Sequence, residues 1–262
     1  MHPILFHFGP IAIYSYGVML MIGFIAAVLW TRREASRRGV DPGKIVDLSI
    51  WLLVSGIVGA RLGFVLLNLH YYLGQTPAAL LFSDGKIAIQ GLSFHGALVG
   101  AVSALLIYAW RTKTSWLLLA DIFAPALAIG YGFGRIGCFL NGCCYGAPTH
   151  LPWGTQFLID PATHTWTPEC HPTQLYAALG SWLIFGLLLW LRPRLSGQGQ
   201  LFASYLGLYG VLRFLVEIFR RGYTAQILVG PLTEAQVASI FLLIASVFLL
   251  IYLRPREAIA QS

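Results

Sequence analysis

Seven long apolar stretches are the feature that most constrains what this sequence can fold into. A helix that crosses a bilayer needs about 20 mainly apolar residues. Charged residues make up only 10% of the 262 residues, whereas soluble proteins carry about 25%, so a soluble domain would lack the polar surface to cover its core. We therefore predict an all-α integral membrane protein with seven transmembrane helices. The predicted spans are residues 11–30, 46–68, 92–110, 116–137, 172–191, 201–219 and 232–253.

The distribution of Lys and Arg predicts how these spans are oriented. Most of the 17 basic residues follow the first, third, fifth and seventh spans, and such residues concentrate on the cytoplasmic side of a membrane. We expect the N-terminus outside and the C-terminus cytoplasmic, in a single polytopic domain over residues 1–262 with an external loop region at about 138–171. The net charge of +7 fits orientation in a lipid bilayer, so we expect no nucleic-acid partner.

Five arginines depart from this rule and predict an anion-binding site. They lie on the second, fourth and sixth spans, toward the outer side of the predicted membrane; they are Arg61, Arg135, Arg213, Arg220 and Arg221. A charge inside a membrane is costly and by default functional. Arginine suits phosphate because its planar fork donates two hydrogen bonds and keeps its charge when desolvated. The simplest anion at this depth is a phospholipid headgroup.

Other polar residues are expected on the same side. His95 lies at the start of the third span, and His171 directly precedes the fifth. One face of the sixth span carries four polar residues at i, i+4, i+8 and i+11: Tyr209, Arg213, Glu217 and Arg220. A His and a Tyr beside arginines can move a proton at near-neutral pH. Together these residues indicate chemistry at a lipid phosphoester, with the phosphate as leaving group.

At these residues the sequence resembles the bacterial prolipoprotein diacylglyceryl transferases, over nearly the whole chain. The matching motifs follow the family's order along all the spans. They are Tyr14-Ser15-Tyr16-Gly17, Gly59-Ala60-Arg61-Leu62-Gly63, Leu92-Ser93-Phe94-His95-Gly96, Asp121, Gly134-Arg135-Ile136-Gly137, His171-Pro172-Thr173-Gln174-Leu175-Tyr176, and Arg213-Phe214 through Glu217 to Arg220.

The resemblance implies the reaction and its location. In that family the enzyme moves the diacylglyceryl group of phosphatidylglycerol to the lipobox cysteine of a prolipoprotein signal peptide. A thioether forms and glycerol phosphate is released, the first step of bacterial lipoprotein maturation. The implied location is the bacterial inner membrane, with the active site toward the periplasm. We expect neither a metal nor an organic cofactor.

The resemblance also implies roles for individual residues. The expected catalytic residues are His95, Arg135, Arg213 and Tyr209. The expected substrate-binding residues are Arg135, Arg61, Tyr16, Asn141, Gly146 and Arg220. For Arg61 a structural role is the alternative, and Arg221 fits an ordinary snorkelling residue at a helix end.

Three further residues are expected to be structural. Glu217 neutralises charge, because it is four residues from Arg213 and three from Arg220. His171 caps its helix and braces the preceding loop. Asp121 is assigned a structural role as well.

The cysteines depart from the family pattern. The family signature usually continues Gly-Asn-Phe-x-Asn-x-Glu, whereas Cys138 and Cys143 replace its Asn and Glu. The lost carboxylate makes the field beside the arginines more positive. With Cys144 and Cys170 a four-ligand zinc set is conceivable, but no C-x₂-C pair is present. We favour a disulfide from Cys143 or Cys144 to Cys170, because the loop faces an oxidising compartment; simple packing is the alternative.

Three other functions stay open at this point. A paralogous transferase with a different acceptor would fit the substituted signature. A lipid- or anion-binding transporter would use the arginines to bind a passing substrate, but internal repeats are missing and the inner halves of the spans carry almost no charge. A thiol-redox membrane protein would need a C-x-x-C pair, whereas Cys143 and Cys144 are adjacent.

Overall fold

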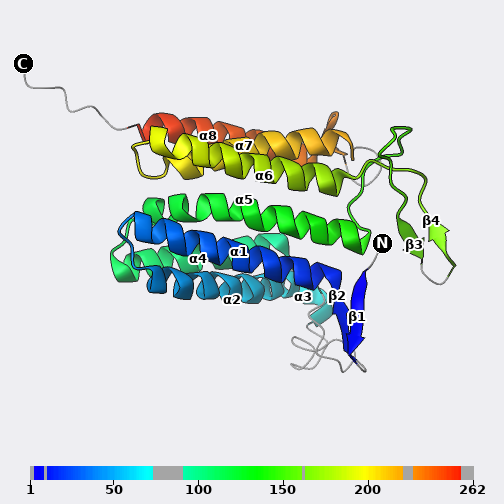
Figure 1. Cartoon of the computed structure of the whole chain (residues 1–262), viewed down its shortest axis with the longest axis horizontal. Helices are drawn as coiled ribbons and strands as arrows, with labels where there is room; N and C mark the ends of the chain where they lie inside the picture. The colour runs from blue at the N-terminus through cyan, green and yellow to red at the C-terminus, as the bar shows by residue number, and fades with distance from the viewer. Residues whose placement is uncertain (1–2, 9–10, 73–90, 161–162, 221–226, 255–262) are drawn as a thin grey trace, which may run out of the picture. The chain divides into compact units, whose positions relative to one another are not determined.

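The computed structural model describes residues 3–8, 11–72, 91–160, 163–220 and 227–254. Within these residues, seven helices are long and apolar enough to cross a membrane, which confirms the predicted all-α membrane fold (Figure 1). They are α1 (Ser15–Arg37), α2 (Pro42–Leu67), α4 (Phe94–Thr112), α5 (Trp116–Asn141), α6 (Thr173–Leu191), α7 (Gln200–Ile218) and α8 (Glu234–Tyr252). Two short helices, α3 (Leu69–Tyr72) and η2 (Arg192–Arg194), follow α2 and α6.

Three short antiparallel hairpins among the described residues were not predicted. They pair β1 (Ile4–Phe8) with β2 (Ile11–Tyr14), β3 (Leu158–Asp160) with β4 (Thr165–Trp166), and β5 (Ile227–Val229) with β6 (Leu232–Thr233). The predicted start of the first span at residue 11 was therefore wrong, because residues 11–14 form β2 and the helix begins at Ser15. Hydropathy alone does not separate a short apolar strand from the start of an apolar helix.

The chain forms two compact units. One comprises residues 31–119, with α2 and α4; the other comprises residues 1–30 and 120–262. The first unit depends on small residues. A Cβ added at Gly59 of α2 would lie 2.4 Å from the Gly96 carbonyl oxygen, and one added at Gly96 of α4 would lie 2.3 Å from the Gly59 oxygen. Glycines therefore bring the two backbones into contact, as small residues commonly do between membrane helices.

In the larger unit, α5, α6 and α7 share a core of mainly small and aliphatic side chains. Its buried members are Ala124, Ala128, Ile184, Leu188, Leu201 and Tyr205. Hydroxyl groups add polar contacts between helices: Ser181 donates to the Ala128 carbonyl over 2.9 Å, and Ser246 of α8 donates to the Ala203 carbonyl over 2.7 Å. This packing holds α5 and α7 together, the two helices of this unit that carry the predicted arginines.

Asp121 of α5 caps the start of α7. Its carboxylate accepts hydrogen bonds from the backbone N–H groups of Gly199 and Phe202, each over 2.8 Å. The N-cap residue of α7 is Gly199 itself, which has no side chain to satisfy these donors. The side chain of Asp121 is 1% exposed, so a buried carboxylate from another helix replaces the missing cap.

Candidate functional site

Arg135 lies near the C-terminal end of α5, above an aromatic cluster. Its guanidinium carbon is 4.8 Å from the ring centroid of Tyr131, one helical turn earlier. The Tyr131 ring meets Tyr209 of α7 edge-on at 5.3 Å, and Tyr209 stacks on Tyr205 at 5.9 Å. A cation held over a ring face is stabilised while its N–H fork remains able to donate.

Tyr209 connects two of the predicted arginines. Its phenol interacts electrostatically with Arg135 of α5 and with Arg213, one turn further along α7. The structure thus brings together three of the four residues that were predicted to be catalytic. Sequence reasoning missed Tyr131, although its i, i+4 spacing to Arg135 was visible.

An ion-pair network follows on α7. Arg213 donates to Oε2 of Glu217 over 2.6 Å, and Arg220 reaches the same oxygen at 3.3 Å. Thr233 donates its hydroxyl to the other carboxylate oxygen at 3.4 Å, and Glu217 is 3% exposed. Two guanidinium groups therefore converge on this one buried carboxylate.

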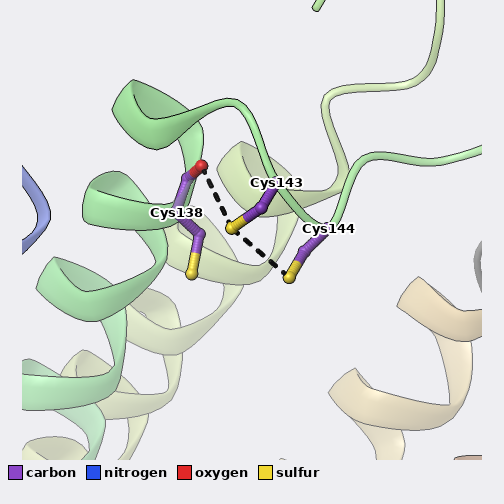
Figure 2. Close-up of side chains that lie close together, drawn as sticks. All are labelled: Cys138, Cys143 and Cys144. Atoms are coloured by element: carbon purple, nitrogen blue, oxygen red, sulfur yellow. Dashed lines mark hydrogen bonds between the residues drawn. The ribbon is translucent and has the colours of Figure 1, made fainter. Parts of the chain in front are cut away.

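Three cysteines gather at the end of α5. Figure 2 shows Cys138 on the last part of the helix, with Cys143 and Cys144 on the chain that follows it. The three sulfur atoms lie within 4.8 Å of one another, and those of Cys143 and Cys144 are 3.6 Å apart. Cys144 interacts electrostatically with Arg135 and with Arg220. The cluster therefore lies beside the predicted phosphate-binding arginines.

Cys143 and Cys144 follow α5, and Cys144 has the more acidic thiol of the two. Hydrogen bonds with Cys138 and Cys143 lower the pKa of Cys144, and the charges of Arg135 and Arg220 act in the same direction. Tyr16 of α1 also belongs to this neighbourhood, since its phenol interacts with all three cysteines and with Arg135.

The expected disulfide to Cys170 was wrong. All four cysteines of the chain lie in described residues and are free thiols. Cys170 is completely buried, and its backbone forms antiparallel bridges with Pro148 and Thr155. Its own loop therefore encloses Cys170, while the turn after α5 directs Cys143 and Cys144 toward Cys138.

The loop between α5 and α6 is anchored to the start of α6. Thr173 donates its hydroxyl to the Cys144 carbonyl over 2.9 Å, and the Gln174 amide donates to the Cys143 carbonyl over 2.6 Å. Further on, Gly146 donates its N–H to the His171 carbonyl over 2.9 Å. A Cβ at Gly146 would lie 2.6 Å from the Phe219 carbonyl oxygen, so only glycine fits there.

His171 does not cap α6 as expected. Pro172 occupies the N-cap position and α6 begins at Thr173. The His171 ring instead lies 3.2 Å from the Tyr176 hydroxyl through Nδ1 and packs against Phe219 at 5.0 Å. Asn141, the last residue of α5, is exposed and contacts the Cys143 thiol.

Two predicted site residues belong to the smaller unit. Arg61 of α2 donates to the Gly91 carbonyl at 3.4 Å, and its guanidinium lies over the rings of Phe64 and Tyr72. His95 is exposed in the first turn of α4, whose N-terminus is capped by the Ser93 side chain. Arg221 lies outside the described residues.

Seven described helices that are long and apolar enough to cross a membrane define a multi-pass membrane protein. The family model for prolipoprotein diacylglyceryl transferase matches residues 3–252. The chain belongs to the prolipoprotein diacylglyceryl transferase family and is an enzyme, a transferase.

Individual relatives agree with this assignment. The phosphatidylglycerol–prolipoprotein diacylglyceryl transferase of Clostridium tetani is 33% identical over 250 residues, covering 95% of this chain and 96% of the relative. The enzyme of that name from Geobacter sulfurreducens is 38% identical over 90% of this chain and 89% of its own length. The Geobacillus kaustophilus enzyme is 38% identical over 95% and 92%.

Proposed function

We propose that this protein transfers the diacylglyceryl group of phosphatidylglycerol to the lipobox cysteine thiol of a prolipoprotein. The thiol sulfur attacks the glyceryl carbon that carries the phosphate, the carbon–oxygen bond breaks, and a thioether forms. The electron pair of that bond leaves with glycerol phosphate, and the thiol proton goes to a base. The observation that carries the proposal is that the Tyr209 phenol interacts with both Arg135 and Arg213, in a member of this family.

Arg135 and Arg213 bind the phosphate of phosphatidylglycerol. Arg135 is held over Tyr131, and Arg213 is oriented by its 2.6 Å ion pair with Glu217. Fixed guanidinium groups bind a phosphodiester and offset the charge that develops on the leaving phosphate, without reorganising during the reaction. Glu217 keeps this charge-dense helix face stable, and Asp121 and His171 support α7 and the loop.

The acceptor thiol must lose its proton, because thiolate is the nucleophile. A free thiol has a pKa of about 8.5, so modest assistance by a neighbouring base is sufficient. His95, with Tyr209, is our candidate for this assistance. The other residues that we propose to bind substrate are Tyr16, Asn141, Gly146, Arg61 and Arg220.

We place the reaction on the periplasmic side of the inner membrane, with the N-terminus periplasmic and the C-terminus cytoplasmic. The support is the concentration of Lys and Arg after the first, third, fifth and seventh helices. Phosphatidylglycerol then enters laterally from the bilayer, and the prolipoprotein signal peptide presents its cysteine from the same side.

The direct test is a transfer assay with purified protein, labelled phosphatidylglycerol and a lipobox peptide. We expect diacylglyceryl peptide and glycerol phosphate in equal amounts, and no product from a peptide with Ser in place of Cys. Arg135→Ala should abolish transfer, whereas the control Arg194→Ala, an exposed arginine on η2, should leave it intact. Lipid binding without transfer to any lipobox peptide would refute the proposed acceptor and indicate a paralogue with a different one.

A further inference from the structure

The proposed reaction does not use the three cysteines at the end of α5. We propose that Cys138, Cys143 and Cys144 form a three-thiolate site for a thiophilic divalent cation, zinc, beside the phosphate-binding arginines. On binding, each of the three thiols loses its proton to water and the cation takes the place of these protons; no redox change occurs.

The sulfur geometry matches a zinc site. Zinc–sulfur bonds of about 2.3 Å at tetrahedral angles place neighbouring sulfurs about 3.8 Å apart. The Sγ atoms of Cys143 and Cys144 are 3.6 Å apart, and all three sulfurs lie within 4.8 Å of one another (Figure 2). Side-chain rotations that shorten the longest sulfur–sulfur distance by about 1 Å therefore complete the coordination triangle, and the backbone need not move.

The backbone is built to hold this triangle. Gly142, with φ of 77°, ends α5 in the left-handed conformation. Its N–H bonds to the Phe139 carbonyl, and the N–H of Cys143 bonds to the Cys138 carbonyl, both over 3.1 Å. These two bonds form a Schellman motif, which turns the chain back and brings Cys143 against Cys138. Cys144 itself adopts a φ of 67°, a conformation that non-glycine residues rarely take.

A second helix fixes the same turn. The carbonyls of Cys143 and Cys144 accept hydrogen bonds from Gln174 and Thr173 of α6. The two cysteines are therefore held from outside the turn as well as from within it, and little ordering remains for a cation to impose. Such preorganisation raises affinity.

The charge balance also favours a cation with three thiolates. Three thiolates around Zn²⁺ leave one net negative charge, and Cys144 interacts with both Arg135 and Arg220. The positive charges of those guanidinium groups offset the negative charge of the cluster. The expectation of no metal, made from the sequence alone, rested on the missing C-x₂-C spacing; here the fold supplies the proximity that the spacing lacks.

The site also suggests a use for the metal, and this step rests on the proposed function. Three protein ligands leave the fourth position of tetrahedral zinc open, which is the arrangement of catalytic rather than structural zinc sites. A thiol that coordinates zinc is deprotonated outright. The open position would accept the acceptor thiol and make it more acidic, so that the proposed base would take its proton and the thiolate would form beside the arginines that are proposed to hold the phosphate.

The test is Co²⁺ binding by the purified full-length protein in detergent, under reducing conditions. We expect one equivalent of Co²⁺ to give a sulfur-to-cobalt charge-transfer band that Zn²⁺ displaces. Cys138→Ser, Cys143→Ser and Cys144→Ser should each lose the band. The matched control Cys170→Ser should retain it, because Cys170 lies outside the cluster.

A second measurement needs no variant and so does not depend on how the variants fold. Zn²⁺ should protect Cys138, Cys143 and Cys144 of the wild-type protein from maleimide, as mapped by peptide mass spectrometry, and a chelator should remove the protection. Absence of both the band and the protection overturns the site, as does a band that survives Cys144→Ser in folded protein.

The acceptor step is tested separately, without lipid. A lipobox peptide should shift the cobalt band, and its Cys→Ser counterpart should not; equal spectra with both peptides overturn this step. Because no phosphatidylglycerol is present, the outcome is independent of the transfer assay. A protein that binds cobalt but transfers nothing keeps the site and refutes the proposed function.

Discussion

Asp121 provides the sharpest test of how the fold supports the site. Its buried carboxylate accepts two backbone hydrogen bonds at the start of α7, the helix that carries Tyr209 and Arg213. A hydrogen bond to a charged group contributes about 1.5–3 kcal/mol, so we expect Asp121→Ala to cost about 3–6 kcal/mol. Asp121→Asn keeps one oxygen acceptor but turns an amide donor toward the other N–H, so we expect about half that cost.

The assay is equilibrium unfolding in detergent micelles, followed by circular dichroism. Asp47→Asn is the matched control, because Asp47 is exposed on α2. We expect the order wild type and Asp47→Asn, then Asp121→Asn, then Asp121→Ala, from most to least stable. An Asp121→Asn protein within about 0.5 kcal/mol of wild type, the range of ordinary surface substitutions, would show that the carboxylate does not act as the cap of α7.

Two further predictions concern the ion-pair network and the helix contact. Glu217→Gln leaves two arginines without their carboxylate, and we expect a loss of about 3 kcal/mol in unfolding free energy; Arg220→Ala should cost less because the 2.6 Å Arg213–Glu217 pair remains, and the reverse order would contradict this reading. Gly59→Ala places a methyl group 2.4 Å from a carbonyl of α4 and should destabilise the protein by about 1–3 kcal/mol. Gly56→Ala is its control, because its Cβ would meet the nearest atom at 3.8 Å; equal thermal stabilities would argue against the close contact of α2 and α4.

Local pattern determined the membrane class and part of the site. Apolar length and scarcity of charge predict seven spans whatever the packing, because a helix that crosses a bilayer needs about 20 mainly apolar residues and satisfies its own backbone hydrogen bonds. The spacing of Arg213, Glu217 and Arg220 places their side chains together on any helix, and the structure contains both ion pairs. The boundary at residues 11–14 was missed because hydropathy does not register strand pairing.

Contacts between distant residues were decided only by the tertiary structure. Asp121 of α5 accepts hydrogen bonds from Gly199 and Phe202 at the start of α7. Arg135 interacts with Tyr209 because α5 and α7 pack on a shared core. The cysteines illustrate the same limit, since the order Cys138, Cys143, Cys144 and Cys170 is compatible with several pairings. The left-handed turn at Gly142 and the enclosure of Cys170 in its own loop select one arrangement, because side-chain proximity depends on how the backbone is held in space and not on distance along the chain.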